Sequence, residues 1–130
     1  MRKLIVMLFL LGVNGVAAAA WEKFEMDGNG DTSYLDKSSI RRYGDKVKVY
    51  VLVDARQIES VGNEKYRSIK SELELDCTRS LVRVAYLSMY TDKMASGIII
   101  KFGALDRELE PIEEGSPSAT LLSLVCATRQ

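Results

Sequence analysis

The sequence predicts an α+β domain: an antiparallel sheet of about five or six strands, one C-terminal helix packed on one face, and one disulfide. Three observations support this prediction. Short segments with alternating apolar residues fill residues 21–102, and a single helical pattern follows at the end of the chain. The chain also has two cysteines, Cys77 and Cys126. Strands first and one helix last are the order expected of an α+β domain.

Residues 1–20 have the pattern of a secretory signal peptide. Arg2 and Lys3 supply the positive charge, residues 4–13 are an apolar run, and residues 17–20 are alanines that suit cleavage. An uncleaved membrane anchor is the alternative, but the apolar run is shorter than the about 20 residues that a bilayer requires. We expect residues 21–130 to form a single exported domain without a transmembrane span. No cysteine lies near the cleavage region, so we expect no lipid anchor.

The charge balance bears on the class of partner. The full chain has 18 basic and 18 acidic residues; without Arg2 and Lys3, 16 basic residues remain against 18 acidic ones, a net charge of −2. A slightly acidic domain lacks the basic surface typical of proteins that bind nucleic acids. We therefore expect no nucleic-acid partner.

The two cysteines are expected to form one disulfide, because exported chains fold in an oxidising compartment. Closing a loop of about 50 residues stabilises a fold by roughly 4 kcal/mol through the chain entropy removed from the unfolded state. A redox pair or a thiol nucleophile is the alternative. The cysteines lack C-x-x-C spacing, however, and the chain has no histidine to activate a thiol.

The first predicted strand, 21–27, leads into the sequence Asp27-Gly-Asn-Gly-Asp31. Glycine accepts positive φ, and Asn and Asp bond their own backbone, so this sequence predicts a turn. A calcium loop is the alternative, but Thr32 stands where an EF-hand needs glycine, and Ser38 stands where it needs glutamate. A second strand is predicted at 32–36 and a third extended piece at 38–42.

The clearest strand is 45–54, in which valines at every second position predict a face toward the core. Residues 55–69 are polar and contain Gly62 and Asn63, so we predict a long loop there. A strand at 70–79 carries Cys77 on its apolar face. Residues 81–90 form the next strand, which either continues the previous one through a bulge or pairs back on it as a hairpin.

The last part of the chain is predicted to contain a turn at 91–97, a strand at 98–102, and an acidic loop at 103–115 with one extended piece. Ser116 suits a helix cap and Pro117 the first helical position. One helical face then carries Leu121, Leu122, Val125 and Cys126, with Leu124 beside it.

The composition argues against an enzyme. The chain has no histidine, which excludes Ser-His-Asp and Cys-His catalysis and histidine metal ligation. No phosphate-binding glycine motif or hydrolase elbow is present. We therefore expect no catalytic, metal or cofactor site. Two acidic groups leave a glycosidase as an alternative, although a solvated strand face and an acidic loop explain them better; they are Glu72, Glu74 and Asp76, and Glu108, Glu110, Glu113 and Glu114. The six tyrosines are expected in the core and rim rather than in a ligand platform.

Several short motifs, taken in order, resemble the surface-adhesin protein E family of small exported proteins of Gram-negative bacteria. The matching residues are Tyr34-Leu-Asp36, Ser39-Ile-Arg41, Gly44, Val47-Lys-Val-Tyr50, Ser71, Asp76-Cys77, Ser88-Met-Tyr90, Met94, Gly97, Ser116 and Val125-Cys126. The resemblance implies a sheet crossed by a helix, one disulfide and, often, a homodimer. It also implies a surface adhesin that binds host matrix or plasma proteins, and haem. Haem is expected as a ligand only because of this resemblance. Tyr50 stands where the family often has tryptophan.

The function expected from these observations is a non-catalytic binding module outside the cytoplasm, periplasmic or associated with the cell surface. The alternative is a structural or assembly factor of the cell envelope. An exposed basic and aromatic rim is the expected contact surface, with a solvated strand edge as the alternative; it consists of Arg41, Arg42, Tyr43, Lys46 and Lys48. The sheet face without the helix is expected to carry Tyr50, Leu52 and part of residues 81–89, which are too apolar to leave bare and suggest a homodimer. The alternative is that the N-terminal segment with Trp21 and Phe24 folds over this face.

Overall fold

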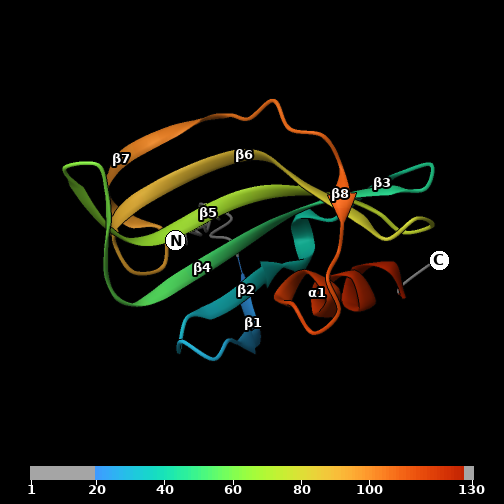
Figure 1. The fold of residues 1–130 in the computed structure, drawn as a ribbon, viewed down its shortest axis with the longest axis horizontal. Coiled ribbons are helices and arrows are strands. Elements are labelled where there is room, and N and C mark those ends of the chain that lie inside the picture. The colour runs from blue at the N-terminus through green and yellow to red at the C-terminus, as the bar shows by residue number, and fades with distance from the viewer. Residues whose placement is uncertain (1–19, 128–130) are drawn as a thin grey trace, which may run out of the picture.

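The computed structural model describes residues 20–127, which form one antiparallel sheet with a single helix on one face (Figure 1). The predicted signal peptide, apart from Ala20, lies outside the described residues. The strands are β1 (Trp21–Met26), β2 (Thr32–Asp36), β3 (Arg41–Tyr43), β4 (Lys46–Val61), β5 (Glu64–Asp76), β6 (Leu81–Asp92), β7 (Ser96–Ala104) and β8 (Glu110–Pro111). The helices are the short 3₁₀ helix η1 (Lys37–Ser39) and α1 (Pro117–Cys126). Within residues 20–127, no helix has the length and apolar character needed to cross a bilayer.

Six strands make up the main path of the sheet, in the order β1-β2-β4-β5-β6-β7. All neighbours are antiparallel, and the short strands β3 and β8 pair with β4 and β6. Figure 1 shows β1 at one edge and β7 at the other, with the chain running from β7 through β8 down to α1. The predicted α+β fold is confirmed.

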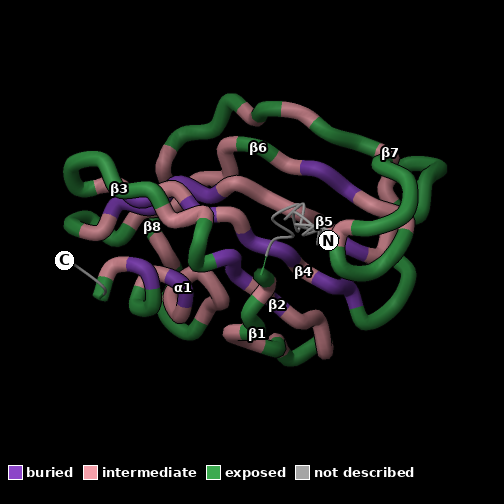
Figure 2. The backbone as a smooth tube through the Cα atoms, turned by 180° about the vertical axis from the view of Figure 1, so that it is seen from behind, coloured by how far each residue is buried: buried purple, intermediate pink, exposed green. Residues whose placement is uncertain are grey.

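The main core lies between the sheet and α1. Its buried members are Leu35, Val47, Val49, Val51, Leu73, Leu75, Leu121 and Val125. The alternating valines of β4 place three branched side chains against the helix, as the sequence predicts. Burying one such side chain stabilises the fold by about 1.5–3 kcal/mol. Figure 2 shows this burial along the first part of β4, at the end of β5 and on α1.

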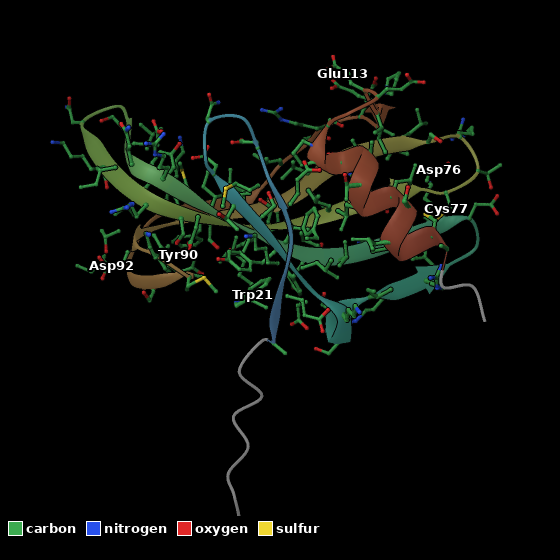
Figure 3. All side chains as sticks on the ribbon, turned by 90° about the horizontal axis from the view of Figure 1, so that it is seen from below. Trp21, Asp76, Cys77, Tyr90, Asp92 and Glu113 are labelled. Carbon is green, nitrogen blue, oxygen red and sulfur yellow. A yellow bond between two sulfur atoms is a disulfide. The ribbon has the colours of Figure 1, made fainter. Side chains whose placement is uncertain are left out.

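The ends of α1 are both held by polar contacts. The backbone N–H of Ala119 donates to the Ser116 hydroxyl at 3.2 Å, and Pro117 occupies the first turn, as predicted. At the other end, the Arg42 guanidinium donates to the carbonyl oxygen of Val125. The predicted Cys77–Cys126 disulfide is confirmed, and it closes a separation of 49 residues beside the end of α1 (Figure 3).

Residues 55–69 are not the long loop that the sequence predicts. β4 continues to Val61 and β5 begins at Glu64, so the two strands form a hairpin around Gly62. The outer pairs are Glu59↔Tyr66, Ser60↔Lys65 and Val61↔Glu64. Residues 56–60 are exposed, so neither side of this arm needs an apolar pattern.

Two further predictions are corrected. The predicted extended piece at 38–42 begins instead with η1, because the Asp36 carboxylate accepts from the Ser38 backbone N–H and turns the chain. Leu52, expected to need cover on the face without the helix, is already fully buried within the single chain. Its register partners are Tyr34 of β2 and Lys70 of β5, whose long side chains flank it.

The hairpin alternative is the correct one for residues 81–90. β6 pairs back on β5 from Asp76↔Leu81 to Ser68↔Tyr90. A bulge interrupts this ladder, because Glu72 pairs with Tyr86 whereas Leu73 pairs with Val84. Ala85 is therefore the extra residue, and it moves Tyr86 to the opposite face from Val84.

Candidate functional site

The sheet face that points away from α1 is called the open face here. Its members are read from the register, because residues directly opposite on neighbouring strands lie on the same face. One row across β4 to β7 is Tyr50–Glu72–Tyr86–Ala104. The next rows are Leu52–Lys70–Ser88–Phe102 and Asp54–Ser68–Tyr90–Ile99. These rows bring residues from more than 50 positions apart onto one surface.

A shallow depression of about 330 Å³ lies on the open face. Its lining is mainly aromatic with one residue of each charge, and it consists of Tyr50, Lys70, Glu72, Tyr86, Ser88, Tyr90, Ile99 and Phe102. The volume is at the lower end of the range typical of small-molecule sites. Four neighbouring strands contribute to the lining, so the depression rests on a hydrogen-bonded framework rather than on a loop.

Contacts inside the depression orient two of its polar groups. The Lys70 ammonium lies 4.8 Å from the centre of the Tyr50 ring, within the range of a cation–π interaction. The Ser88 hydroxyl donates to the Tyr90 hydroxyl at 3.1 Å. Among the described residues, Glu72 belongs to no ion pair. The depression therefore offers both a cation and a carboxylate.

The apolar wall of the depression is unusually exposed. Phe102 is 68% exposed, Ile99 49% and Tyr86 38%. Ile98, also on β7, is 70% exposed. β7 is the last strand of the main path, so its outer edge pairs with no strand in the described part of the chain. Figure 2 shows β7 largely as an exposed segment.

The predicted rim is brought together only in part. Arg41 lies opposite Lys48 and Tyr43 opposite Lys46, which places these four residues on the open face next to Tyr50. The Lys48 ammonium lies 5.8 Å from the centre of the Tyr43 ring. Arg42 points the other way, since it pairs with Val47 and its guanidinium holds the end of α1.

Two of the acidic residues of β5, Glu74 and Asp76, have structural partners. Glu74 is buried and its carboxylate lies 2.7 Å from Arg83 Nε. The Asp76 carboxylate accepts from the backbone N–H groups of Thr78 and Arg79 in the following turn. These contacts, the N–H of Arg79 foremost, hold the pKa of Asp76 below its usual value. Glu74 therefore serves an ion pair and Asp76 a turn. These contacts do not support a pair of catalytic carboxyl groups of the kind that a glycosidase uses.

Metal binding has no support in the described residues. Within residues 20–127, no three metal-ligating side chains gather in one place. The Asp27 carboxylate accepts from the backbone N–H groups of Asn29 and Asp31 and thereby closes the β1–β2 turn. Asp31 in turn accepts from the N–H of Arg56. These carboxylates therefore serve the predicted turn.

Haem does not fit the open face. The chain has no histidine and both cysteines are bonded, which leaves tyrosine and methionine as side chains that bind haem iron. The Tyr90 hydroxyl already accepts from Ser88. The lining comes from one face of one sheet, so a macrocycle there would be held on one side. We derive no haem chemistry for this chain.

The sequence favours core and rim positions for the tyrosines over a surface on which they bind a ligand together. The structure brings Tyr50, Tyr86 and Tyr90 onto one depression. Strict alternation along 81–90 would place Tyr86 on the same face as Val82 and Val84, and only the bulge at Ala85 separates them. A signal that would have indicated the platform is the exposed apolar run of β7, Ile98 to Phe102.

Comparison with known proteins agrees with this fold. A family model described as surface-adhesin protein E matches residues 21–127. The chain is similar to Haemophilus influenzae protein E in crystal form II, with a TM-score of 0.65 at 15% identity, over 85% of this chain and 89% of that one. Another structure of Haemophilus influenzae protein E is similar with a TM-score of 0.63 at 15% identity, over 85% of this chain and 86% of that one. A search of curated proteins finds no significant match.

Protein E from non-typeable Haemophilus influenzae is similar as well, with a TM-score of 0.61 at 15% identity, over 85% of this chain and 77% of that one. At such identity the solved structures show a shared fold. The family match itself spans β1 to the end of α1, including both cysteines. The chain belongs to the surface-adhesin protein E family.

Proposed function

We propose that the protein is an exported, non-catalytic binding module that takes a protein partner outside the cytoplasm, in the periplasm or at the cell surface. The observation that carries this proposal is the exposed apolar and aromatic surface formed by Tyr86, Ile99 and Phe102 on the open face. Exposed apolar patches rimmed by polar residues are typical of interaction sites. Surface adhesins, the family to which the chain belongs, are exported and typically non-catalytic.

The rim extends this surface on one side. Arg41, Tyr43, Lys46 and Lys48 lie on the same face as the depression. Arginine and tyrosine supply directed hydrogen bonds and large contact areas, and both are enriched at interface centres. Arg42 is left out of the proposed contact surface because its guanidinium serves α1.

The test is surface plasmon resonance of the disulfide-bonded mature chain against a panel of matrix and plasma proteins. We expect at least one partner to bind, and we expect Arg41→Glu and Phe102→Ala each to weaken that binding by about tenfold, a loss of 1.4 kcal/mol. Lys65→Glu, at the exposed tip of the β4–β5 hairpin, is the matched charge control. Binding that Lys65→Glu weakens as much as Arg41→Glu would remove the open face from the proposal.

We further propose that the protein forms a homodimer through the outer edge of β7. An exposed apolar edge strand is a template for pairing with another strand. Lys93 lies in the turn before β7 and Lys101 within the strand, and Asp106, Arg107 and Glu108 follow its end. Antiparallel pairing of two β7 strands would place Lys93 of each chain near the acidic residues that follow β7 in the other.

Light scattering of the mature chain checks the dimer. We expect a dimer in the micromolar range, shifted toward monomer by Ile98→Lys. A monomer at every concentration of the unchanged chain would end this part of the proposal and leave the binding module itself standing. Pairing at the edge of β7 extends the sheet and leaves the open face accessible.

A further inference from the structure

We propose that the depression on the open face is a saccharide-binding site for a mono- or disaccharide unit of a neutral glycan. This inference rests on the proposed binding function and names the chemistry of one part of its surface. The depression spans β4 to β7 and has a volume of about 330 Å³, in the size range of small-ligand sites.

The first argument concerns the shape and polarity of the ligand. A sugar ring presents a flat apolar surface of C–H groups and a perimeter of hydroxyls. Phe102 and Tyr86 offer exposed aromatic rings, and Ile99 adds aliphatic surface beside them. Aromatic side chains provide a large contact area while losing few rotamers on binding. The strands beneath them are paired on both sides or, for β7, on one side, which fixes the backbone positions from which the rings project.

The second argument concerns the polar groups at the same surface. Lys70 donates hydrogen bonds only, the Glu72 carboxylate accepts only, and the Tyr90 hydroxyl does both. Sugar hydroxyls donate and accept, so they match this mixed set. Lys70 and Glu72 are two residues apart on β5 and face the same way. Their opposite charges give the depression no net charge, which disfavours phosphate and other anions as the ligand.

The third argument separates a saccharide from a peptide. An extended peptide that adds to a sheet takes its affinity from backbone hydrogen bonds at a free edge, here the outer edge of β7. The depression instead lies over the face of strands whose backbone groups already pair with one another. A ligand seated there is recognised by side chains alone, which suits a glycan, because a glycan has no peptide backbone to pair with a strand edge.

The test is an NMR titration of the isotope-labelled, disulfide-bonded mature chain with three probes: chitotriose, lactose and maltotriose. Concentrations up to about 10 mM detect Kd values in the millimolar range. We expect at least one probe to shift the amide signals of Tyr86, Ser88 and Phe102 in a saturable way. Phe102→Ala and Glu72→Gln are each expected to weaken that binding by tenfold or more.

Matched variants keep the result interpretable. Phe102 is largely exposed, so its truncation leaves the fold intact, which the dispersion of the same spectra verifies. Ile58→Ala removes an exposed apolar side chain from the β4–β5 arm, outside both the depression and the rim, and is expected to leave the affinity unchanged.

Three results would overturn the inference: none of the three probes shifts these signals, both depression variants bind as the unchanged chain does, or a synthetic peptide of residues 96–104 saturates the depression while the sugars do not. If the sugars fail while a matrix or plasma protein still binds, only the saccharide site is lost and the binding module remains.

Discussion

Two turns at opposite ends of the sheet are fixed by different means. The turn between β5 and β6, residues 77–80, is bound to α1 by the Cys77–Cys126 disulfide. The turn between β6 and β7, residues 93–95, is held by hydrogen bonds to β4 and β5. Figure 3 shows Cys77 beside the helix, and Tyr90 and Asp92 at the far end of the molecule. The depression lies toward the end without the covalent link.

The β6–β7 turn relies on two buried polar groups from distant parts of the chain. The backbone N–H of Met94 donates to the Asp54 carboxylate at 2.7 Å, and that of Ala95 donates to the Ser68 hydroxyl at 3.0 Å. The Ser68 hydroxyl itself donates to the carbonyl oxygen of Asp92 at 2.6 Å. These bonds hold two consecutive residues without glycine in the left-handed region, with φ values of 58° and 55°.

The proposed binding surface therefore lies at the less strongly tied end of the sheet. A disulfide acts mainly by restricting the unfolded chain, whereas the Asp54 and Ser68 contacts act only in the folded state. β7, which carries Phe102 and Ile99, begins directly after the hydrogen-bonded turn. Changes at the two turns are therefore expected to separate global stability from the placement of β7.

The largest effect is expected from removing the disulfide. Cys77→Ala combined with Cys126→Ala should lower the free energy of unfolding by about 2–5 kcal/mol, because the unfolded chain regains the freedom of a long loop. Urea unfolding of the variant and of the unchanged chain measures the difference. Intact-mass analysis with and without reductant confirms the bond in the exported protein. Two thiols that react with an alkylating agent before reduction would contradict this account.

The end of the sheet that carries the disulfide is also the part of the fold that the sequence predicts best. The valine alternation, the Ser116 cap and the pairing of two cysteines in an exported chain are local or compositional signals. The far end lacks such signals. The Met94–Ala95 turn has none of the glycine or asparagine that such a turn usually needs, and its support comes from Asp54 and Ser68, about 40 and 27 residues earlier.

The candidate site was harder to predict for the same reason. Tyr50 and Phe102 lie on strands that meet only after the whole sheet has formed. The bulge at Ala85 reverses the face of Tyr86, and a bulge without glycine leaves no mark in the apolar pattern. The sequence predicts a loop for the β4–β5 arm because most of its residues are polar, and residues 56–60 are indeed exposed.

The second effect tests how β7 leaves the hydrogen-bonded turn. Gly97 has a φ of 81°, and a Cβ there would lie 2.3 Å from the Thr91 hydroxyl, which also accepts from the N–H of Ile98. Gly97→Ala should cost about 2–3 kcal/mol, since a left-handed alanine costs 1–2 kcal/mol before any clash. Gly62→Ala is the control, with a φ of 61° and open space around its Cβ position. Equal losses measured by urea unfolding would show that the clash contributes nothing.

The third effect concerns the buried Asp54 carboxylate, which accepts a hydrogen bond from the β6–β7 turn. Asp54→Ala leaves the N–H of Met94 without its carboxylate and should cost about 1–2 kcal/mol in unfolding free energy. Asp54→Asn keeps an oxygen acceptor in the same position, so it should recover most of that loss. NMR signals of β7 are expected to shift in the alanine variant and to return toward their usual positions in the asparagine variant. Identical losses in both variants would mean that the negative charge, rather than the hydrogen bond, holds the turn.

The smallest effect has the opposite sign. Ala95 has a φ of 55°, where glycine pays no Cβ penalty, and its N–H rather than its side chain makes the contact with Ser68. Ala95→Gly should therefore raise the unfolding free energy by about 0.5–1 kcal/mol, because relief of the left-handed strain exceeds the added freedom of the unfolded chain. Ala104→Gly, at the end of β7, has no such strain to relieve and is expected to lower stability. Urea unfolding of the two glycine variants measures the difference. A loss of stability in both variants would show that the turn is not strained. Asp54 and Ser68 would then bind a conformation that the chain adopts without them.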